Sequence, residues 1–162
     1  MQKDNRMQAV FETKRCCIRP FIESDLDAFV VYRNNLEWME FQYFKGLARE
    51  EYEKILLREP SVEKGAQFAI IRKNDQALLG DIFMKKEAEA CWIGYTISPS
   101  FKRQGYAYET IQGMIRWIQQ SHRGLKILAG TSPENLASIQ LLKKLEFAPA
   151  GTEEGELVFQ YV

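Results

Sequence analysis

The 162-residue sequence contains a single histidine, His122, and only three cysteines, Cys16, Cys17 and Cys91. One histidine excludes a zinc site with two histidine ligands, and any Ser-His-Asp triad would have to include His122. The cysteines form no CxxC motif, and Cys16 and Cys17 would face opposite sides of an extended strand. We therefore expect free thiols, no metal site, and the reducing conditions of the cytoplasm.

The sequence also lacks net charge, because 22 Lys and Arg residues balance 22 Asp and Glu residues. Bulk charge would not recruit the protein to nucleic acid or to an anionic membrane, although neutrality allows a local basic patch. No apolar run approaches the roughly 20 residues of a membrane span. The first seven residues include Lys3, Asp4 and Arg6 and lack the apolar run of a signal peptide. We expect a cytoplasmic protein with neither a nucleic-acid nor a membrane partner.

What the sequence does contain is a globular composition, with 46% hydrophobic and 27% charged residues. A chain of this length forms one ordinary domain, and no repeat, low-complexity tract or Gly/Ser-rich linker divides it. The sequence predicts one domain over residues 1–162, in which residues 1–12 are a loosely ordered N-terminal segment.

The hydrophobic pattern predicts secondary structure along the whole chain. Strands are expected over residues 13–21, 67–72, 77–85, 91–97, 125–129, 147–150 and 156–162. Helices are expected from Ser24 through Val30 and over residues 48–58, 105–120 and 135–145. Ser24 and Asp27 resemble a capping box, and Asn74-Asp75 is a hairpin signal. Hairpins in the first half and β-α-β-α units in the second predict an α+β (mixed α/β) fold with helices on both faces of a mixed sheet.

Residues 97–109 join a strand to a long helix through a loop that carries Lys102, Arg103 and Gly105. The first N–H groups of a helix have no partner within it, the helix dipole is positive there, and glycine lets a phosphate approach closely. The loop has neither the GKS/GKT ending of a P-loop nor the GxGxxG of a Rossmann fold. The join indicates either an anion-binding site or an ordinary helix cap.

Several short motifs follow one another in a fixed order along the chain. They are Ile18-Arg19-Pro20, Leu79-Gly80-Asp81-Ile82, Trp92-Ile93-Gly94-Tyr95, Ser98-Pro99, Lys102-Arg103-Gln104-Gly105-Tyr106-Ala107, Asn135-Leu136-Ala137-Ser138 and Lys144-Leu145-Glu146-Phe147. In their order and spacing, residues 13–162 resemble the GNAT superfamily of acetyl-CoA-dependent N-acetyltransferases. The branch they resemble is that of ribosomal-protein alanine N-acetyltransferases (RimJ/RimL-like). The resemblance implies a mostly antiparallel central sheet of about seven strands.

The resemblance also implies a set of cofactor-binding residues. These are Ile97, Lys102, Arg103, Gln104, Gly105, Tyr106, Ala107, Asn135 and Ser138. Backbone groups at Ile97 would bind the pantetheine arm, amides 103–107 the pyrophosphate, and Asn135 and Ser138 the thiol end. Two strands that separate after Gly94 would leave a slot for the thioester. The implied co-substrate is acetyl-CoA, with no metal, and the implied acceptor is a primary amine on a protein N-terminus or a small molecule. The protein would act as a monomer or a homodimer.

The implied reaction needs a base for the amine and a proton for the leaving thiolate. The candidates for the base are Asp81 and Glu109, with Glu89 as a third acid that we expect to be merely solvated. A solvent-facing position would equally explain Asp81, and a salt bridge would explain Glu109. Tyr95, Trp38 and Phe41 are candidates for lining the acceptor site, although packing alone would also account for them.

Three positions depart from the family pattern. Lys102 stands where Gln or Arg is usual, Leu142 stands where many relatives have a tyrosine that protonates the thiolate, and Glu146 replaces a glycine. A left-handed residue other than glycine at position 146 would cost on the order of 1 kcal/mol. Leu142 leaves open the alternative that the chain is a catalytically silent acyl-CoA-binding sensor or scaffold.

Overall fold

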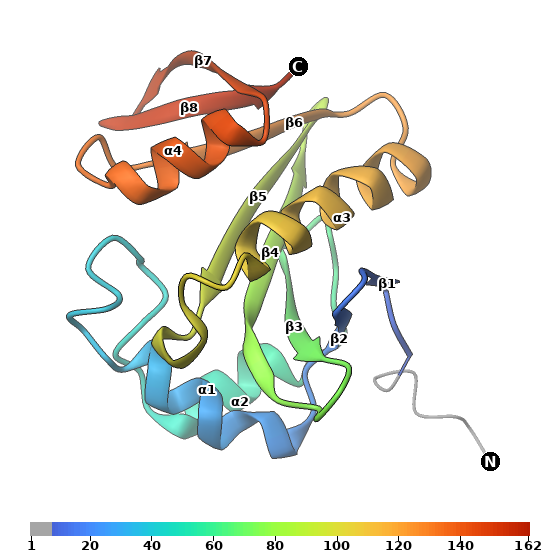
Figure 1. Cartoon of the computed structure of the whole chain (residues 1–162), viewed down its shortest axis with the longest axis vertical. Helices are drawn as coiled ribbons and strands as arrows, with labels where there is room; N and C mark the ends of the chain where they lie inside the picture. Colours follow the sequence, from blue (N-terminus) through green and yellow to red (C-terminus); the bar gives the residue numbers. More distant parts are fainter. Residues whose placement is uncertain (1–7) are drawn as a thin grey trace.

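The fold is built on one eight-stranded sheet, seen in the computed structural model, which describes residues 8–162 (Figure 1). The strands are β1 (Phe11–Glu12), β2 (Cys16–Pro20), β3 (Ala66–Arg72), β4 (Leu78–Glu87), β5 (Ala90–Ile97), β6 (Lys126–Thr131), β7 (Phe147–Glu153) and β8 (Glu156–Tyr161). Their order across the sheet is β1-β2-β3-β4-β5-β6-β8-β7. Neighbouring strands are antiparallel except β5 and β6, which are parallel. The mixed, mostly antiparallel sheet predicted from the sequence is confirmed.

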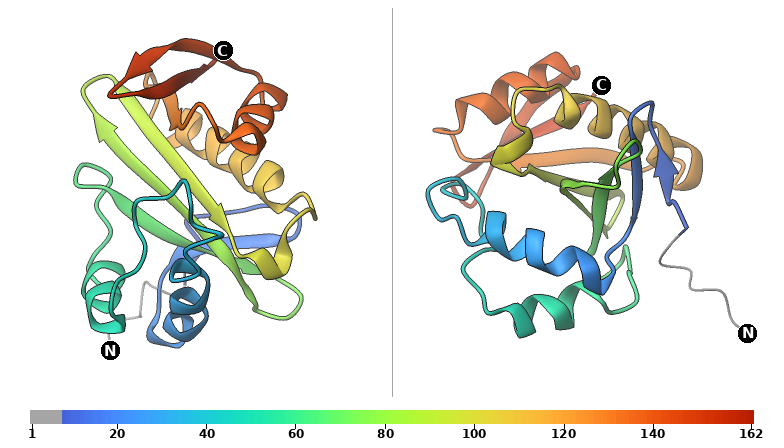
Figure 2. Two further views of the ribbon diagram at one scale, coloured as in Figure 1. Left: turned by 90° about the vertical axis from the view of Figure 1, so that its left-hand side faces the viewer. Right: turned by 60° about the horizontal axis from the view of Figure 1, so that its bottom comes forward.

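Four α-helices cover the two faces of this sheet. They are α1 (Leu26–Arg33), α2 (Arg49–Leu56), α3 (Tyr106–Ser121) and α4 (Leu136–Lys144). Figure 2 shows α1 and α2 on one side of the sheet and α3 and α4 on the other. The helices agree with the predicted ranges to within a few residues.

Two hydrophobic clusters hold these layers together. One lies between the sheet and α3, whose buried stripe includes Ile111, Met114, Ile115 and Ile118, and it extends to Leu142 of α4. The other joins α1 and α2 to β3 and to the segment just after β2; its buried members are Phe21, Leu26, Phe29, Tyr32, Met39, Tyr52, Leu56, Ala69 and Ile71. Because each face of the sheet has its own apolar cluster, helices are needed on both.

Two sequence-based expectations need correction. Residues 11–12, placed in the loose N-terminal segment, form β1 and pair with Ile18 and Cys17 of β2; this adds an eighth strand. Residues 1–7 of that segment lie outside the described residues. The capping box of Ser24 and Asp27 is wrong: Asp25 Oδ2 accepts a hydrogen bond from Ile22 N at 2.9 Å, and a short 3-10 turn (Glu23–Asp25) precedes α1.

The parallel pairing of β5 and β6 is short, and this feature positions the site. Registered pairs run from Ala90–Lys126 to Ile93–Ala129 and end there, although β5 continues to Ile97. From that point β6 is paired only with β8. The predicted separation of two strands after Gly94 is therefore confirmed.

All three cysteines are free, as expected. Within residues 8–162, no helix combines the length and the apolar character needed to cross a bilayer. The same residues bring together no group of three His, Cys, Asp or Glu side chains that could hold a metal ion.

Candidate active site

The loop between β5 and α3 turns sharply in front of a long helix. Gly105 is the N-cap residue of α3 with a φ of +82°, and Arg103 also has a left-handed φ of +60°. Glycine adopts this conformation without the steric cost that a side chain adds. The turn brings the cations of Lys102 and Arg103 into the loop that ends at the unpaired N–H groups of the first helical turn.

A groove of about 760 Å³ runs past this loop, and we call it the α3–α4 groove. All nine residues of the expected cofactor set line it: Ile97, Lys102, Arg103, Gln104, Gly105, Tyr106, Ala107, Asn135 and Ser138. The expected acceptor-side residues Tyr95, Trp38 and Phe41 line the same groove. The end of β5 that has no β6 partner therefore lies in one cavity with the N-terminal ends of α3 and α4.

Polar contacts join β5 to α4 across the groove. Asn135 caps α4, and its Oδ1 accepts a hydrogen bond from Ser138 N at 3.2 Å. The hydroxyls of Ser138 and Tyr95 are 3.0 Å apart. Burial raises the pKa of Tyr95 above its usual value, and the hydrogen bond with Ser138 offsets only part of that effect. Leu142, one helical turn beyond Ser138, is fully buried and also lines the groove.

The loop between α1 and α2 is tied to the end of β5 by Trp38. Its indole Nε1 donates a hydrogen bond to the carbonyl of Ile97 at 2.8 Å, and Lys102 Nζ lies 5.8 Å from the ring centre. A carbonyl oxygen has two lone pairs, so Ile97 retains one for another donor.

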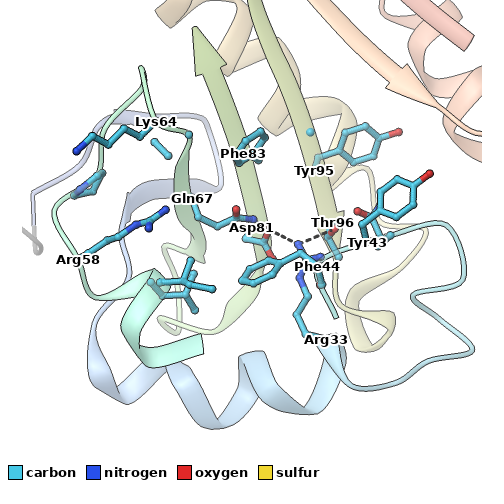
Figure 3. Close-up of a pocket in the computed structure, with 17 residues that line it drawn as sticks. Arg33, Tyr43, Phe44, Arg58, Lys64, Gln67, Asp81, Phe83, Tyr95 and Thr96 are labelled. Carbon is cyan, nitrogen blue, oxygen red and sulfur yellow. Dashed lines mark hydrogen bonds and ion pairs between the residues drawn. The ribbon is translucent and has the colours of Figure 1, made fainter. Parts of the chain in front are cut away.

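A second cavity, of about 490 Å³, is lined by residues of α1, α2, β3, β4 and β5, and we call it the Asp81 pocket (Figure 3). It adjoins the α3–α4 groove, because Gly94, Tyr95 and Thr96 of β5 line both cavities. A molecule in one cavity would therefore lie next to a molecule in the other at the point where β5 leaves β6.

Asp81 is fully buried at the centre of a hydrogen-bond network. Its Oδ1 accepts hydrogen bonds from Arg33 Nη2 at 2.6 Å and Gln67 Nε2 at 2.5 Å, and its Oδ2 accepts one from the Tyr32 hydroxyl at 2.5 Å. Arg33 Nη2 also donates to Thr96 Oγ1 at 3.1 Å. Burial raises the pKa of Tyr32 strongly, and the nearby Asp81 charge adds to the effect. Both oxygens of Asp81 are engaged, which favours a structural ion pair over the base that the sequence suggests.

Glu109, the other candidate base, lines neither cavity. Its Oε2 accepts hydrogen bonds from the Thr13 hydroxyl at 2.5 Å and Arg15 N at 2.9 Å, and Arg15 Nε donates to Oε1 at 2.7 Å. Burial alone would raise the pKa of Glu109, but the hydrogen bonds from Thr13 and Arg15 outweigh it and lower the pKa. These contacts favour the alternative role as a salt bridge that holds α3 to the β1–β2 hairpin.

The sequence-based set omits Arg33, Tyr32 and Gln67, the partners of Asp81. One signal for Arg33 is present in the sequence: it follows Leu26 by seven residues and Phe29 by four, on the apolar face of α1. A charge on an apolar helix face requires a buried partner. The spacing does not say which acid supplies it, because Asp81 is 48 residues away.

Comparison with known proteins agrees with this architecture. The Acetyltransferase (GNAT) domain matches residues 15–148. An uncharacterized N-acetyltransferase of Bacillus subtilis (strain 168), YnaD, is 28% identical over 135 residues, which are 82% of this chain and 79% of that protein. The ribosomal protein uS5-alanine N-acetyltransferase of Escherichia coli (strain K12) is 32% identical over 62 residues, 38% of this chain and 32% of its own length.

A solved structure is similar in fold. The spermidine N-acetyltransferase from Vibrio cholerae, in complex with CoA and spermine, superimposes with a TM-score of 0.76 at 15% identity, covering 90% of this chain and 93% of that one. The domain match spans most of the chain, including β2 through α4 and the whole β5–α3 loop. The chain belongs to the GNAT family of acetyltransferases.

Proposed function

We propose that the protein transfers an acetyl group from acetyl-CoA to a primary amine, by direct attack of the amine while both substrates are bound. The observation that carries this proposal is the junction of two cavities at Gly94, Tyr95 and Thr96. One cavity has the features that an acyl-CoA needs, and the other gives a second substrate access to the same point of β5.

The α3–α4 groove fits the chemistry of CoA along its length. The N-terminus of α3, with Lys102 and Arg103, suits the pyrophosphate, because unpaired amides and cations both favour an anion. The free edge of β5 beyond Ile93 suits the amides of pantetheine, which would bond to it as an added strand does. Asn135 and Ser138 would then lie near the thiol end. No charge is needed from the chain as a whole, which is neutral.

The acceptor amine would enter from the Asp81 pocket and attack the thioester carbonyl at the junction. The new C–N bond forms, the C–S bond breaks, and the proton released by the amine balances the proton gained by the thiolate. We propose that the Tyr95 hydroxyl donates this proton to sulfur and regains one from the acetylated nitrogen or from water. A tyrosine hydroxyl is protonated at neutral pH, burial raises the pKa of Tyr95 further, and the Ser138 hydroxyl 3.0 Å away orients it. Tyr95 of β5 would thus supply the thiolate with the proton that Leu142 of α4 cannot supply.

Release of free CoA thiol from acetyl-CoA in the presence of an amine panel tests the proposed function. We expect thiol release that depends on the amine, with formation of the N-acetyl product detected by mass spectrometry. Binding of acetyl-CoA without turnover on any amine would favour the silent acyl-CoA-binding module instead.

The Tyr95→Phe variant tests the role of the hydroxyl. We expect kcat to fall by about tenfold or more, since positioned acids contribute at least this much, while the KM for acetyl-CoA changes little. Tyr161→Phe is the matched control, because Tyr161 is also a half-buried tyrosine but lines neither cavity. An unchanged kcat in Tyr95→Phe would mean that water, and not Tyr95, donates the proton to the leaving thiolate.

A further inference from the structure

The lining of the Asp81 pocket carries information about the acceptor, provided that the proposed function holds. The pocket has a volume of about 490 Å³, within the usual range for small-molecule sites. Its lining includes the apolar side chains of Phe44, Ile55, Leu56, Pro60 and Phe83. Such walls favour a substrate with an apolar body.

The charges on the pocket are unbalanced. Arg33, Arg58 and Lys64 line it, and among residues 8–162 the only carboxylate that lines it is Asp81. Asp81 is already paired with Arg33 and accepts two further hydrogen bonds. Arg58 and Lys64 are exposed, and neither forms an ion pair with any other residue between 8 and 162. The described lining therefore presents an entering substrate with two cations and no unpaired carboxylate.

The two cations and the junction lie at different sides of the pocket. Figure 3 shows Arg58 and Lys64 on the side of the pocket away from Tyr95. An amine that reaches the junction at Tyr95 would extend its other end toward these cations. In addition, Arg33 is almost fully buried and its Nε has no hydrogen-bond partner among the described residues, so one donor of the pocket wall is unused.

We propose that the acceptor is a primary amine on an apolar body that carries a carboxylate at its opposite end, and that it is not a polyamine. The carboxylate pairs with Arg58 and Lys64, for which the planar guanidinium offers two parallel donors. A polyamine would bring its second ammonium group against these same cations, where like charges repel and no free carboxylate compensates.

Three amines with six carbons each separate these possibilities: 6-aminohexanoate, hexylamine and 1,6-diaminohexane. Their reacting ends are alike, and their far ends are anionic, apolar and cationic. With saturating acetyl-CoA, we expect kcat/KM to fall in that order, by about tenfold between the first and the last. Equal values for the three amines, or preference for the diamine, would overturn the proposal.

Charge reversal of the two cations completes the test. In the Arg58→Glu, Lys64→Glu double variant, we expect the order of the three amines to invert in favour of the diamine. Arg116→Glu with Arg123→Glu is the matched control, since it makes the same change in charge at exposed residues that line neither cavity. An unchanged order in the Arg58 and Lys64 variant would overturn the proposal. If acetyl-CoA binds but no amine of any kind is acetylated, the proposed function itself fails.

Discussion

The α3–α4 groove and the Asp81 pocket share three residues of β5, but they are built in different ways. The groove consists largely of backbone features: the N-termini of two helices, a left-handed glycine and a strand edge without a partner. The pocket depends on side chains from α1, β3, β4 and β5 that meet around Asp81. A site built from backbone groups tolerates many side-chain substitutions but not a change of backbone conformation. A network of side chains is instead sensitive to the substitution of any of its members.

The largest expected effect concerns the side-chain network. Asp81→Ala removes the partner of a buried arginine, which should lower the free energy of unfolding by about 3–5 kcal/mol. The matched control is Asp75→Ala, because Asp75 pairs with Arg72 at the surface, where solvent screens the pair and its loss costs little stability. Urea unfolding of both variants measures the difference. If Asp81→Ala lowers the free energy of unfolding as little as Asp75→Ala does, the Asp81 pocket does not depend on its side-chain network.

Gly105→Val tests the backbone site. Valine is strained at a φ of +82°, so the loop must rearrange and its amides leave their positions. The strain comes from conformation and not from a clash, since an added Cβ would meet Arg15 Nη2 at an ordinary 3.5 Å. We expect the affinity for acetyl-CoA to fall by about 100-fold or more, roughly 3 kcal/mol, in calorimetric titration.

Gly124→Val is the control for that experiment. Gly124 has nearly the same φ, +83°, in the turn after α3, and an added Cβ has nothing within 4 Å. It therefore carries equal strain away from the groove, and its affinity for acetyl-CoA should match that of the wild type. Equal losses of affinity in both variants would attribute the effect of Gly105→Val to general destabilisation.

The same contrast explains what could be predicted from the sequence. Eight of the nine groove residues are contiguous from Lys102 to Ala107 or lie at the start of α4, and Ile97 ends β5, so the ordered short motifs that resemble the GNAT family were enough to select residues that line one groove. The Asp81 network links positions 32, 33, 67 and 81, whose proximity follows from the register of β3 with β4 and the packing of α1. No local pattern encodes that register. Strand β1 was missed for a similar reason: it has two residues, too few for a periodic pattern.

Glu109 of α3 accepts hydrogen bonds from Thr13 and Arg15, and the stability that these contacts contribute should depend on pH. Its pKa is lower in the folded state, so its stabilisation is complete above its ordinary pKa of 4.5 and is lost as the pH falls through the lowered folded value. Glu109→Gln should reduce the free energy of unfolding by about 1–2 kcal/mol at neutral pH. That difference from the wild type should shrink toward zero in strong acid.

Urea unfolding at a series of pH values measures this difference. Glu134→Gln serves as the control, because Glu134 is exposed and its side chain accepts one hydrogen bond, from Ser132. A Glu109→Gln difference that stays constant from neutral to strongly acidic pH would show that Glu109 acts through packing and not through charge.

The smallest expected effect is a gain in stability, at Glu146 just beyond the C-terminal end of α4. Glu146 follows the C-cap residue Leu145 with a φ of +71°, a left-handed conformation that glycine adopts without strain. Glu146→Gly should raise the free energy of unfolding by about 0.5–1 kcal/mol, since relief of strain exceeds the added entropy of the unfolded chain. For a chain of this size the melting temperature should rise by about 2–4 °C per kcal/mol.

The Glu146→Ala variant is the control, because it removes the same exposed carboxylate but keeps a Cβ, so it should give no such gain. If Glu146→Ala raises the free energy of unfolding as much as Glu146→Gly does, the carboxylate charge and not backbone strain destabilises the protein at this position. Either way, acetyl-CoA affinity should stay unchanged, because Glu146 itself does not line the groove.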